Sequence, residues 1–270
     1  MLRDAHLLKP DFGEPPPVRQ QLTATTEADV EQLARGAQPN AETSAIWSGG
    51  VVRPPDGATV NTVYGEWVVP RPYPPALNGT FSYDSTWVGI DGDGSSDILL
   101  AGITANTMGV QVFGNPQVVV SAYAWYDWWS PETVDPRAVY PKVIPNFPFA
   151  FGEKIACYIY VTSTRSANID LYNMSRRQMM PFSLNAPPDT SLVGNCAEWI
   201  VERPTDPVSL RPTQLANYGS VAFESCFAVF SDGTNASSDA GSNINMTDDV
   251  GGVISVGNLV GADVVTCTYI

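Results

Sequence analysis

WVGIDG, residues Trp87–Gly92, is the stretch that decides the fold of this chain. Bulky apolar side chains alternate in it with small or acidic ones, which puts Trp87 and Asp91 on the same face of a β-strand. Trp125 and Asp127 share a face by the same two-residue period. The pattern recurs in two further segments, YAWYDWW (Tyr123–Trp129) and CAEWIVE (Cys196–Glu202). We therefore predict a sheet on which these segments line one aromatic, acidic groove.

The chain as a whole has the composition of an all-β domain. Of its 270 residues, 44% are hydrophobic, which is enough for one large core. Runs of period two alternate with turn clusters, supported by 23 prolines and 22 glycines. The pattern predicts antiparallel strands in a β-sandwich or jelly roll, with the aromatic strand at 118–129 in a central position. We expect the stretch Ser231–Gly252, rich in Gly, Ser, Asn and Asp, to be an exposed loop.

Residues 1–45 differ from the rest, so we predict an N-terminal arm or pro-segment over 1–45 and a β-sandwich over 46–270. The arm is rich in proline at Pro10–Pro17. One short helix is expected at Glu27–Arg35, because Thr26 can cap it and Gly36 can end it. A disordered linker is the alternative for the proline-rich part.

The charge of the chain excludes two classes of partner. It has 28 acidic and 14 basic residues, for a formal net charge of -14. Phosphate backbones and anionic membrane surfaces would be repelled, so we expect neither a nucleic acid nor a membrane partner. No run approaches the roughly 18 apolar residues that span a bilayer. The first residues lack the apolar core of a signal peptide, so we expect that such a segment is missing or that export does not use it.

The single histidine restricts the chemistry. His6 lies in the N-terminal arm, which removes histidine-based triads and zinc sites from the β domain. Catalysis would have to come from carboxylates, amides or hydroxyls, and we expect no metal and no cofactor. The four cysteines form no C-x-x-C motif, and both disulfides and buried thiols are compatible with their spacing.

Seven motifs, in order, resemble the glutamic peptidases, also called eqolisins, over about residues 45–270. They are WSGG (47–50), WVVP (67–70), WVGIDGDGSSDILLAG (87–102), YAWYDWW (123–129), AEWIVERP (197–204), LANYGSVAF (215–223) and DVVTCTYI (263–270). The resemblance implies a concanavalin-like β-sandwich of two curved antiparallel sheets and an acid endopeptidase that uses no metal. It also implies secretion, a pro-segment that residues 1–45 would supply, and a polypeptide substrate or peptide ligand in the groove. We expect a monomer.

In that family a glutamate in A-E-[WF]-I and a glutamine in I-L-Q-x-G form the catalytic pair. Glu198 matches the first: its carboxylate could take a proton from the attacking water and return it to the leaving amine. Leu100, in ILLAG, stands where the glutamine belongs. Leucine donates no hydrogen bond to an oxyanion, so we expect an impaired or inactive peptidase, natural or engineered. Gln111 and Gln117 could restore a donor only if one of them reached the groove.

Further positions match residues that line the family's groove. Trp87 could offer a platform for substrate, with core packing as its alternative, and Asp91 could orient Glu198 by a hydrogen bond. Asp127 replaces the usual glutamate and should lie across a hairpin from Leu100. Trp125 and Tyr123 precede it on the same face, Tyr123 where an aspartate is sometimes found.

Three functions are compatible with these residues. The first is an acid endopeptidase of the glutamic type, active or residually active. The second is a β-sandwich that binds peptide or carbohydrate without turnover. The third is glycoside hydrolysis by Glu198 and Asp127 as paired carboxylates, which the lack of an E-x-D-x-x-E strand disfavours.

Overall fold

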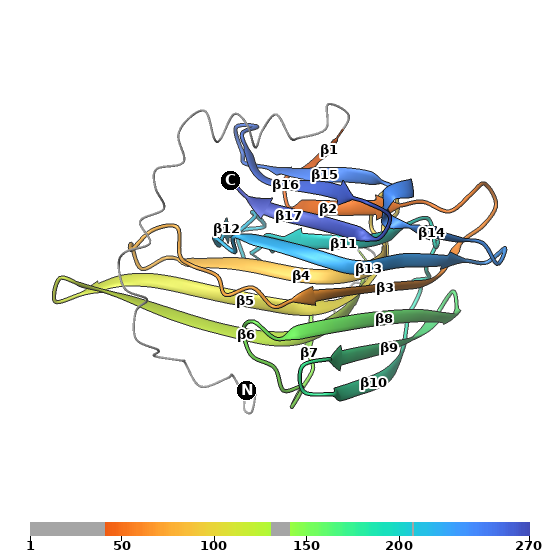
Figure 1. The fold of residues 1–270 in the computed structure, drawn as a ribbon, viewed down its shortest axis with the longest axis horizontal. Coiled ribbons are helices and arrows are strands. Elements are labelled where there is room, and N and C mark those ends of the chain that lie inside the picture. The colour runs from red at the N-terminus through yellow and green to blue at the C-terminus, as the bar shows by residue number, and fades with distance from the viewer. Residues whose placement is uncertain (1–40, 131–140, 207) are drawn as a thin grey trace.

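The computed structural model describes residues 41–130, 141–206 and 208–270, and this part of the chain is built from β-strands in two packed layers (Figure 1). It contains no α-helix. The strands are β1 (Glu42–Ser44), β2 (Trp47–Val52), β3 (Val60–Val68), β4 (Phe81–Asp91), β5 (Ile98–Val112), β6 (Asn115–Trp129), β7 (Lys142–Val143), β8 (Lys154–Ser163), β9 (Ser166–Asn173), β10 (Gln178–Asn185), β11 (Ala197–Glu202), β12 (Gln214–Leu215), β13 (Ser220–Phe230), β14 (Asn235–Ser237), β15 (Ser242–Thr247), β16 (Val253–Val260) and β17 (Val264–Tyr269).

The two layers are joined through one ladder of strand pairs. The groove layer runs β7, β6, β5, β4, β11, β2, β15, and the outer layer runs β16, β17, β13, β3, β8, β9, β10. Pairing of β15 with β16 connects them. These pairs are antiparallel, and the short strands β1 and β12 add parallel pairs to β15 and β4. The predicted all-β antiparallel sandwich is confirmed.

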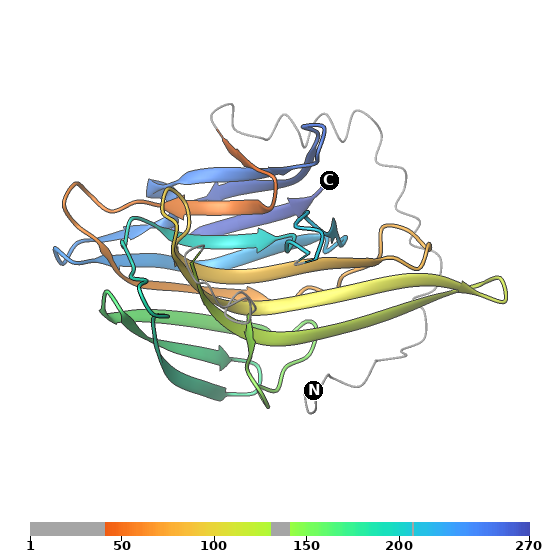
Figure 2. The same ribbon diagram turned by 180° about the vertical axis from the view of Figure 1, so that it is seen from behind.

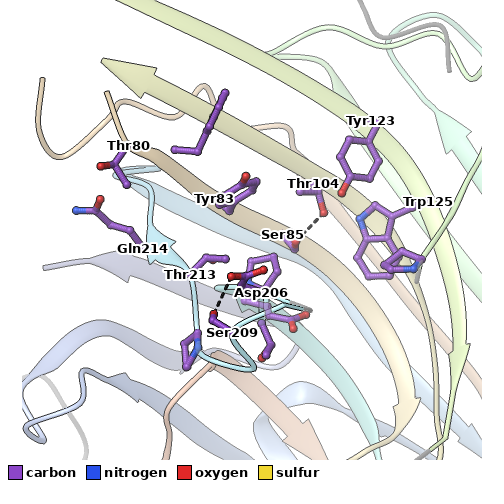
Figure 3. Close-up of a pocket in the computed structure, with 16 residues that line it drawn as sticks. Thr80, Tyr83, Ser85, Thr104, Tyr123, Trp125, Asp206, Ser209, Thr213 and Gln214 are labelled. Carbon is purple, nitrogen blue, oxygen red and sulfur yellow. Dashed lines mark hydrogen bonds between the residues drawn. The ribbon is translucent and has the colours of Figure 1, made fainter. Parts of the chain in front are cut away.

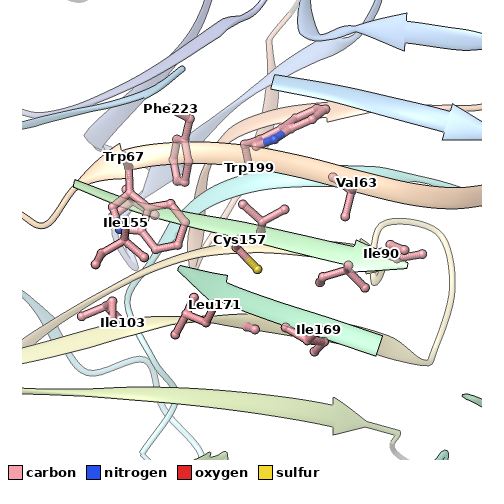
Figure 4. Packing of buried hydrophobic residues seen from close by; sticks show 14 of the residues in the cluster. Val63, Trp67, Ile90, Ile103, Ile155, Cys157, Ile169, Leu171, Trp199 and Phe223 are labelled. Atoms are coloured by element: carbon pink, nitrogen blue, oxygen red, sulfur yellow. The ribbon is translucent and has the colours of Figure 1, made fainter. Parts of the chain in front are cut away.

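Apolar side chains from both layers fill the space between them (Figure 4). Trp67 and Phe223 of the outer layer pack ring against ring, with centroids 5.8 Å apart. Trp199 of β11 reaches across from the groove layer, and its Nε1 donates a hydrogen bond of 2.8 Å to the carbonyl oxygen of Tyr64 on β3. Because Trp199 points into this core, its neighbours Glu198 and Ile200 point to the other face of β11.

The long hairpin of β5 and β6 extends past the ends of the neighbouring strands (Figure 2). β5 is one continuous strand, and β6 pairs with it along its whole length. Phe113 and Gly114 form its turn, both with positive φ (49° and 80°), which is the geometry that a two-residue hairpin turn requires. Trp128 of β6 faces the core while Trp125 faces the groove side, as expected for a strand with aromatic residues on both faces.

The predicted exposed loop at Ser231–Gly252 is wrong from residue 235 to residue 247, where β14, a short 3-10 helix and β15 follow one another. Residues 242–247 form β15, whose inner positions are buried. Asn243 Nδ2 donates to the carbonyl of Gly257 at 3.0 Å, and Asn245 Oδ1 accepts from the amide of Gly257 at 3.1 Å. These hydrogen bonds satisfy the polar side chains of Asn243 and Asn245, which are typical of a surface loop. Ile244 and Met246 supply the apolar contacts of β15.

The N-terminal prediction is only partly within the described residues. The helix expected at Glu27–Arg35 lies outside them, as does most of the arm, while Glu42–Ser44 forms β1 beside β15. The four cysteines are buried free thiols. Within residues 41–130, 141–206 and 208–270, no helix has the length and apolar character needed to cross a membrane.

Candidate active site

Glu198, Leu100 and Asp127 lie in one row across four strands of the groove layer. Glu198 on β11 pairs with Gly89 on β4, Gly89 with Leu100 on β5, and Leu100 with Asp127 on β6. Paired residues point to the same face, which we call the groove face. The row brings together the three positions that the sequence motifs select.

Gly89 leaves room between Glu198 and Leu100, and Trp87 occupies it. A Cβ atom at Gly89 would lie 2.8 Å from Cζ3 of the Trp87 ring, so the indole covers the glycine. Two strand spacings, about 10 Å, separate the backbones of Glu198 and Leu100. The indole of Trp87 therefore fills space between Glu198 and Leu100, the two positions that the motifs select.

Glu198 is fully buried, with 0% of its surface exposed. Its Oε1 accepts a hydrogen bond of 3.5 Å from the thiol of Cys196, and Oε2 has no partner among the described residues. Val51, Trp87, Leu100 and Ile200 belong to the apolar cluster on this face. Burial, followed by the charge of Asp93, raises the pKa of Glu198 well above its ordinary value, so its protonated form is favoured.

Asp127 and Leu100 form the other end of the row. Leu100 is 6% exposed and Asp127 is 7% exposed. Burial raises the pKa of Asp127 to about 7, against opposing effects of Lys142 and of the backbone amide of Trp128. The predicted position of Asp127 across the hairpin from Leu100 is confirmed.

Gln111 and Gln117 lie far from Leu100 along the β5–β6 hairpin. Gln117 pairs with Val110 at the tip of the β5–β6 hairpin, and Gln111 pairs with Pro116. At about 3.3 Å per residue, the eleven positions from Leu100 to Gln111 correspond to roughly 36 Å along the strand. Neither amide reaches the row that contains Glu198.

Asp91 has different partners from the one that the sequence analysis expects. Its carboxylate accepts hydrogen bonds from the backbone amides of Val193, Gly194 and Asn195, at 2.7, 3.0 and 2.7 Å. Asp91 itself has a positive φ of 68°, which turns the end of β4 toward this segment. Burial raises the pKa of Asp91 despite these three donors. The carboxylate thus fixes the segment that leads into β11, and its charge contributes to the raised pKa of Glu198.

Glu202 is a groove-face carboxyl that the sequence analysis misses. It lies four residues after Glu198 on β11, so the period-two rule that selects Glu198 applies equally to it. Trp87 Nε1 donates to its Oε2 at 2.7 Å, and the ring of Trp47 packs edge-on against Trp87 with centroids 5.4 Å apart. Burial raises the pKa of Glu202 to about 7, and the charge of Asp127 contributes.

A cavity of about 570 Å³ opens on the groove face next to Glu202 (Figure 3). Its walls include Tyr83, Ser85, Thr104, Tyr123, Trp125 and Glu202. Ser85 and Thr104 share a hydrogen bond of 2.6 Å across β4 and β5. Glu198 and Leu100 do not line this cavity. Tyr123 and Trp125 are therefore the sequence-selected residues that a ligand in the cavity would meet.

No group of three or more His, Cys, Asp and Glu side chains in the described part of the chain could hold a metal ion. The groove face offers carboxyls, hydroxyls and indole donors. These side chains can transfer protons and form hydrogen bonds.

Comparison with known proteins agrees with the fold. A model described as the peptidase A4 family matches residues 45–269. The chain belongs to this family. Aspergillopepsin-2 of Aspergillus niger is 27% identical over 260 residues, which are 90% of this chain and 84% of that protein. The family is that of the glutamic peptidases, as the motifs indicate.

Solved structures of peptidase A4 relatives share the architecture. Scytalido-glutamic peptidase with a transition state analog inhibitor superposes with a TM-score of 0.66 at 22% identity, covering 84% of this chain and 99% of that one. Aspergilloglutamic peptidase from Aspergillus niger gives a TM-score of 0.56 at 28% identity, covering 70% of this chain and 99% of that one. SCP-B, an eqolisin in a complex with the tripeptide Ala-Ile-His, gives 0.61 at 20% identity, covering 84% and 99%. The two-layer fold is thus common to the family.

Proposed function

We propose that this member of the peptidase A4 family binds polypeptide in the groove and hydrolyses it weakly or not at all. The observation that carries the proposal is the row itself, in which Leu100 stands two strands from a fully buried Glu198. Structures of relatives with peptide-based inhibitors and a tripeptide support peptide as the ligand. The protein would act outside the cell at acid pH, in keeping with its excess of acidic residues.

Two physical effects lower the expected rate. Hydrolysis by Glu198 has two requirements. The carboxylate must remove a proton from a water molecule as that water attacks the peptide carbonyl, and a hydrogen-bond donor must stabilise the resulting oxyanion. Leu100 provides no donor, and loss of one such donor costs about 10²- to 10³-fold in rate. Burial of Glu198 adds a second effect, because its raised pKa reduces the fraction of the carboxylate that can act as the base.

Binding without turnover is the alternative that the same observation favours. The cavity beside Glu202 is open, while Glu198 is fully buried beside an apolar cluster. Glycoside hydrolysis by Glu198 and Asp127 is disfavoured, because three strand spacings between them give about 14 Å. The two carboxyl groups of glycosidases lie about 5 to 9.5 Å apart.

The test is a cleavage assay on an unfolded protein substrate in the acid range. The unmodified chain is compared with Leu100→Gln, with Glu198→Gln and with the double variant. Ile98→Gln is the matched control, because Ile98 lies on the same strand and in the same apolar cluster. Peptide binding is measured on each variant in parallel.

We expect Leu100→Gln to cleave about 10²-fold or more faster than the unmodified chain and the double variant to lose that gain. Ile98→Gln should not gain activity. Cleavage by the unmodified chain that equals Leu100→Gln, or that survives Glu198→Gln, would contradict the impairment. Absence of both cleavage and peptide binding would overturn the whole proposal.

A further inference from the structure

Four asparagines of the chain stand in N-x-S/T motifs, the acceptor sequence for N-linked glycans in secreted proteins. They are Asn78, Asn173, Asn235 and Asn245. A glycan is bulky and hydrated, so the amide that carries it has to reach solvent in the folded protein. The structure divides the four by this requirement: Asn78 and Asn235 are exposed, whereas Asn173 and Asn245 are 0% and 4% exposed.

The two buried asparagines are committed to the fold. Asn173 Nδ2 donates to the carbonyl oxygen of Pro148 at 2.9 Å and to Oε2 of Glu153 at 2.8 Å, so both hydrogens of its amide are used. Asn245 lies in β15, and its Oδ1 accepts from the amide of Gly257 at 3.1 Å. A sugar on either side chain would break these contacts and would need space that packed strands do not leave. The folded chain therefore carries no glycan at Asn173 or Asn245.

Asn78 has the opposite surroundings. Its Oδ1 accepts a hydrogen bond of 3.0 Å from the amide of Thr80, which closes a turn around Gly79. Gly79 has a positive φ of 79°, and its amide donates to the carbonyl oxygen of Gly109 on β5 at 2.8 Å. The turn is thus held by the backbone and by Oδ1, while Nδ2 has no hydrogen-bond partner in the described part of the chain. The nitrogen that would carry a sugar is free.

Exposed apolar side chains distinguish Asn78 from Asn235. Leu77 and Phe81, which flank the Asn78 motif, are 40% and 44% exposed. Asn235 instead follows the polar turn at residues 231–234 and lies in β14, at the end of the molecule away from the start of β4 (Figure 1). A glycan on Asn78 would shield apolar surface that otherwise faces water.

The Asn78 motif also borders the groove. Thr80 and Phe81 line the cavity beside Glu202. Figure 3 shows Thr80 at the end of this cavity opposite Trp125. Because Asn78 lies only two residues before Thr80, a glycan on it would stand at the rim of the groove.

We propose that Asn78 carries an N-linked glycan, which stands at the rim of the groove and covers Leu77 and Phe81. In the transfer, Nδ2 of Asn78 forms a bond to C1 of the first N-acetylglucosamine of a lipid-linked oligosaccharide diphosphate. The bond between C1 and the diphosphate oxygen breaks, the lipid diphosphate leaves, and Nδ2 loses one proton. The inference rests on the extracellular location in the proposed function and adds a modification site that takes no part in peptide hydrolysis.

The test uses the full chain, directed into the secretory pathway of a yeast by an added signal peptide. Peptide N-glycosidase releases glycans and converts each acceptor asparagine into an aspartate, so mass spectrometry of the proteolytic peptides then locates the site. Thr80→Ala removes the hydroxyl that the motif requires and leaves Asn78 in place. Thr80→Ser is the matched control, because it keeps a hydroxyl at that position.

We expect the original sequence and Thr80→Ser to carry a glycan at Asn78, and Thr80→Ala and Asn78→Gln to lose the whole mass of that glycan. Peptides that contain Asn173 or Asn245 should keep their unmodified mass. Secreted protein without a glycan at Asn78, or folded protein with one at Asn173, overturns the assignment. Failure of the proposed function would show instead as the absence of both cleavage and peptide binding, which the mass measurement does not depend on.

The covering of Leu77 and Phe81 is measured with the dye ANS, whose binding reports exposed apolar surface. Thr80→Ala should bind more dye than Thr80→Ser, with circular dichroism used to verify that both are folded. Asn235→Gln removes the other exposed motif and should leave dye binding unchanged. Equal dye binding by Thr80→Ala and Thr80→Ser would contradict the covering.

Discussion

Leu100 and Asp127 are direct partners across the β5–β6 ladder, so an isobutyl group stands against a carboxyl that is 7% exposed. A glutamine at position 100 would place an amide donor next to that carboxyl. The pairing explains why the pKa of Asp127 is raised to about 7, since burial is not offset by a hydrogen bond from its neighbour.

We expect Leu100→Gln to lower the pKa of Asp127 by about one unit or more, because a hydrogen bond to the carboxylate favours its charged form. The measurement is a pH titration of the Asp127 side-chain carbonyl by carbon-13 NMR. Ile98→Gln is the control, since Ile98 pairs with Trp129 and not with Asp127. An unchanged titration in Leu100→Gln would mean that the two side chains do not interact.

The bond from Trp87 to Glu202 should contribute measurably to stability. Trp87→Phe leaves a half-buried carboxyl without its donor, which costs about 1–3 kcal/mol in the free energy of unfolding, in addition to the lost ring volume. Trp67→Phe is a matched control, because Trp67 is also 0% exposed and its Nε1 has no partner among the described residues. Urea denaturation of both variants gives the difference. Equal losses would show that the bond contributes nothing beyond packing.

Stability should fall as the pH rises from about 4 to about 7. Asp127 and Glu202 have ordinary values of 3.8 and 4.5, and each is raised to about 7 in the folded chain. In that window the folded state binds more protons than the unfolded state, so each unit increase in pH lowers the free energy of unfolding. The combined loss is on the order of several kcal/mol and is complete above about pH 7. Thermal melts across pH measure it.

The double variant Asp127→Asn, Glu202→Gln removes both titrating groups and should flatten this part of the stability profile. The remaining slope would come from other buried acids such as Asp84, whose pKa burial also raises well above its ordinary value. Stability of the unmodified chain that increases between pH 4 and pH 7 would contradict the assignment.

Asp91 should be important for the order of the segment before β11. Asp91→Asn keeps the shape and tolerates the positive φ, but it replaces a charged acceptor of three amides by a neutral one. We expect a loss of about 1–3 kcal/mol and faster hydrogen exchange at the amides of Val193 and Asn195. Asp189→Asn is the control, being an exposed aspartate with a similar φ of 62°. Unchanged exchange in Asp91→Asn would exclude this role.

The sequence predicted on which face of a strand the site residues lie, but it did not predict their partners. Local alternation was enough to put Trp125 and Asp127 on one face and Trp128 on the other, because the direction of a side chain in a strand depends only on its parity. The partner of Asp91 could not be predicted in this way, because it is set by a contact over about one hundred residues of chain. The same parity rule places Glu202 on the face of Glu198. Its surroundings depend on Trp87 and on a cavity that forms only when the strands pack.

By itself the sequence determined that the chain is an all-β member of its family, because strand period, turn residues and motif order are local properties. Tertiary structure alone decided that Glu198 is fully buried, that Asp91 holds the backbone before β11, and that the open cavity lies beside Glu202. The reason is physical: burial, pKa and cavity shape depend on side chains that pairing of β11, β4, β5 and β6 brings together. No local pattern in the chain encodes those distances.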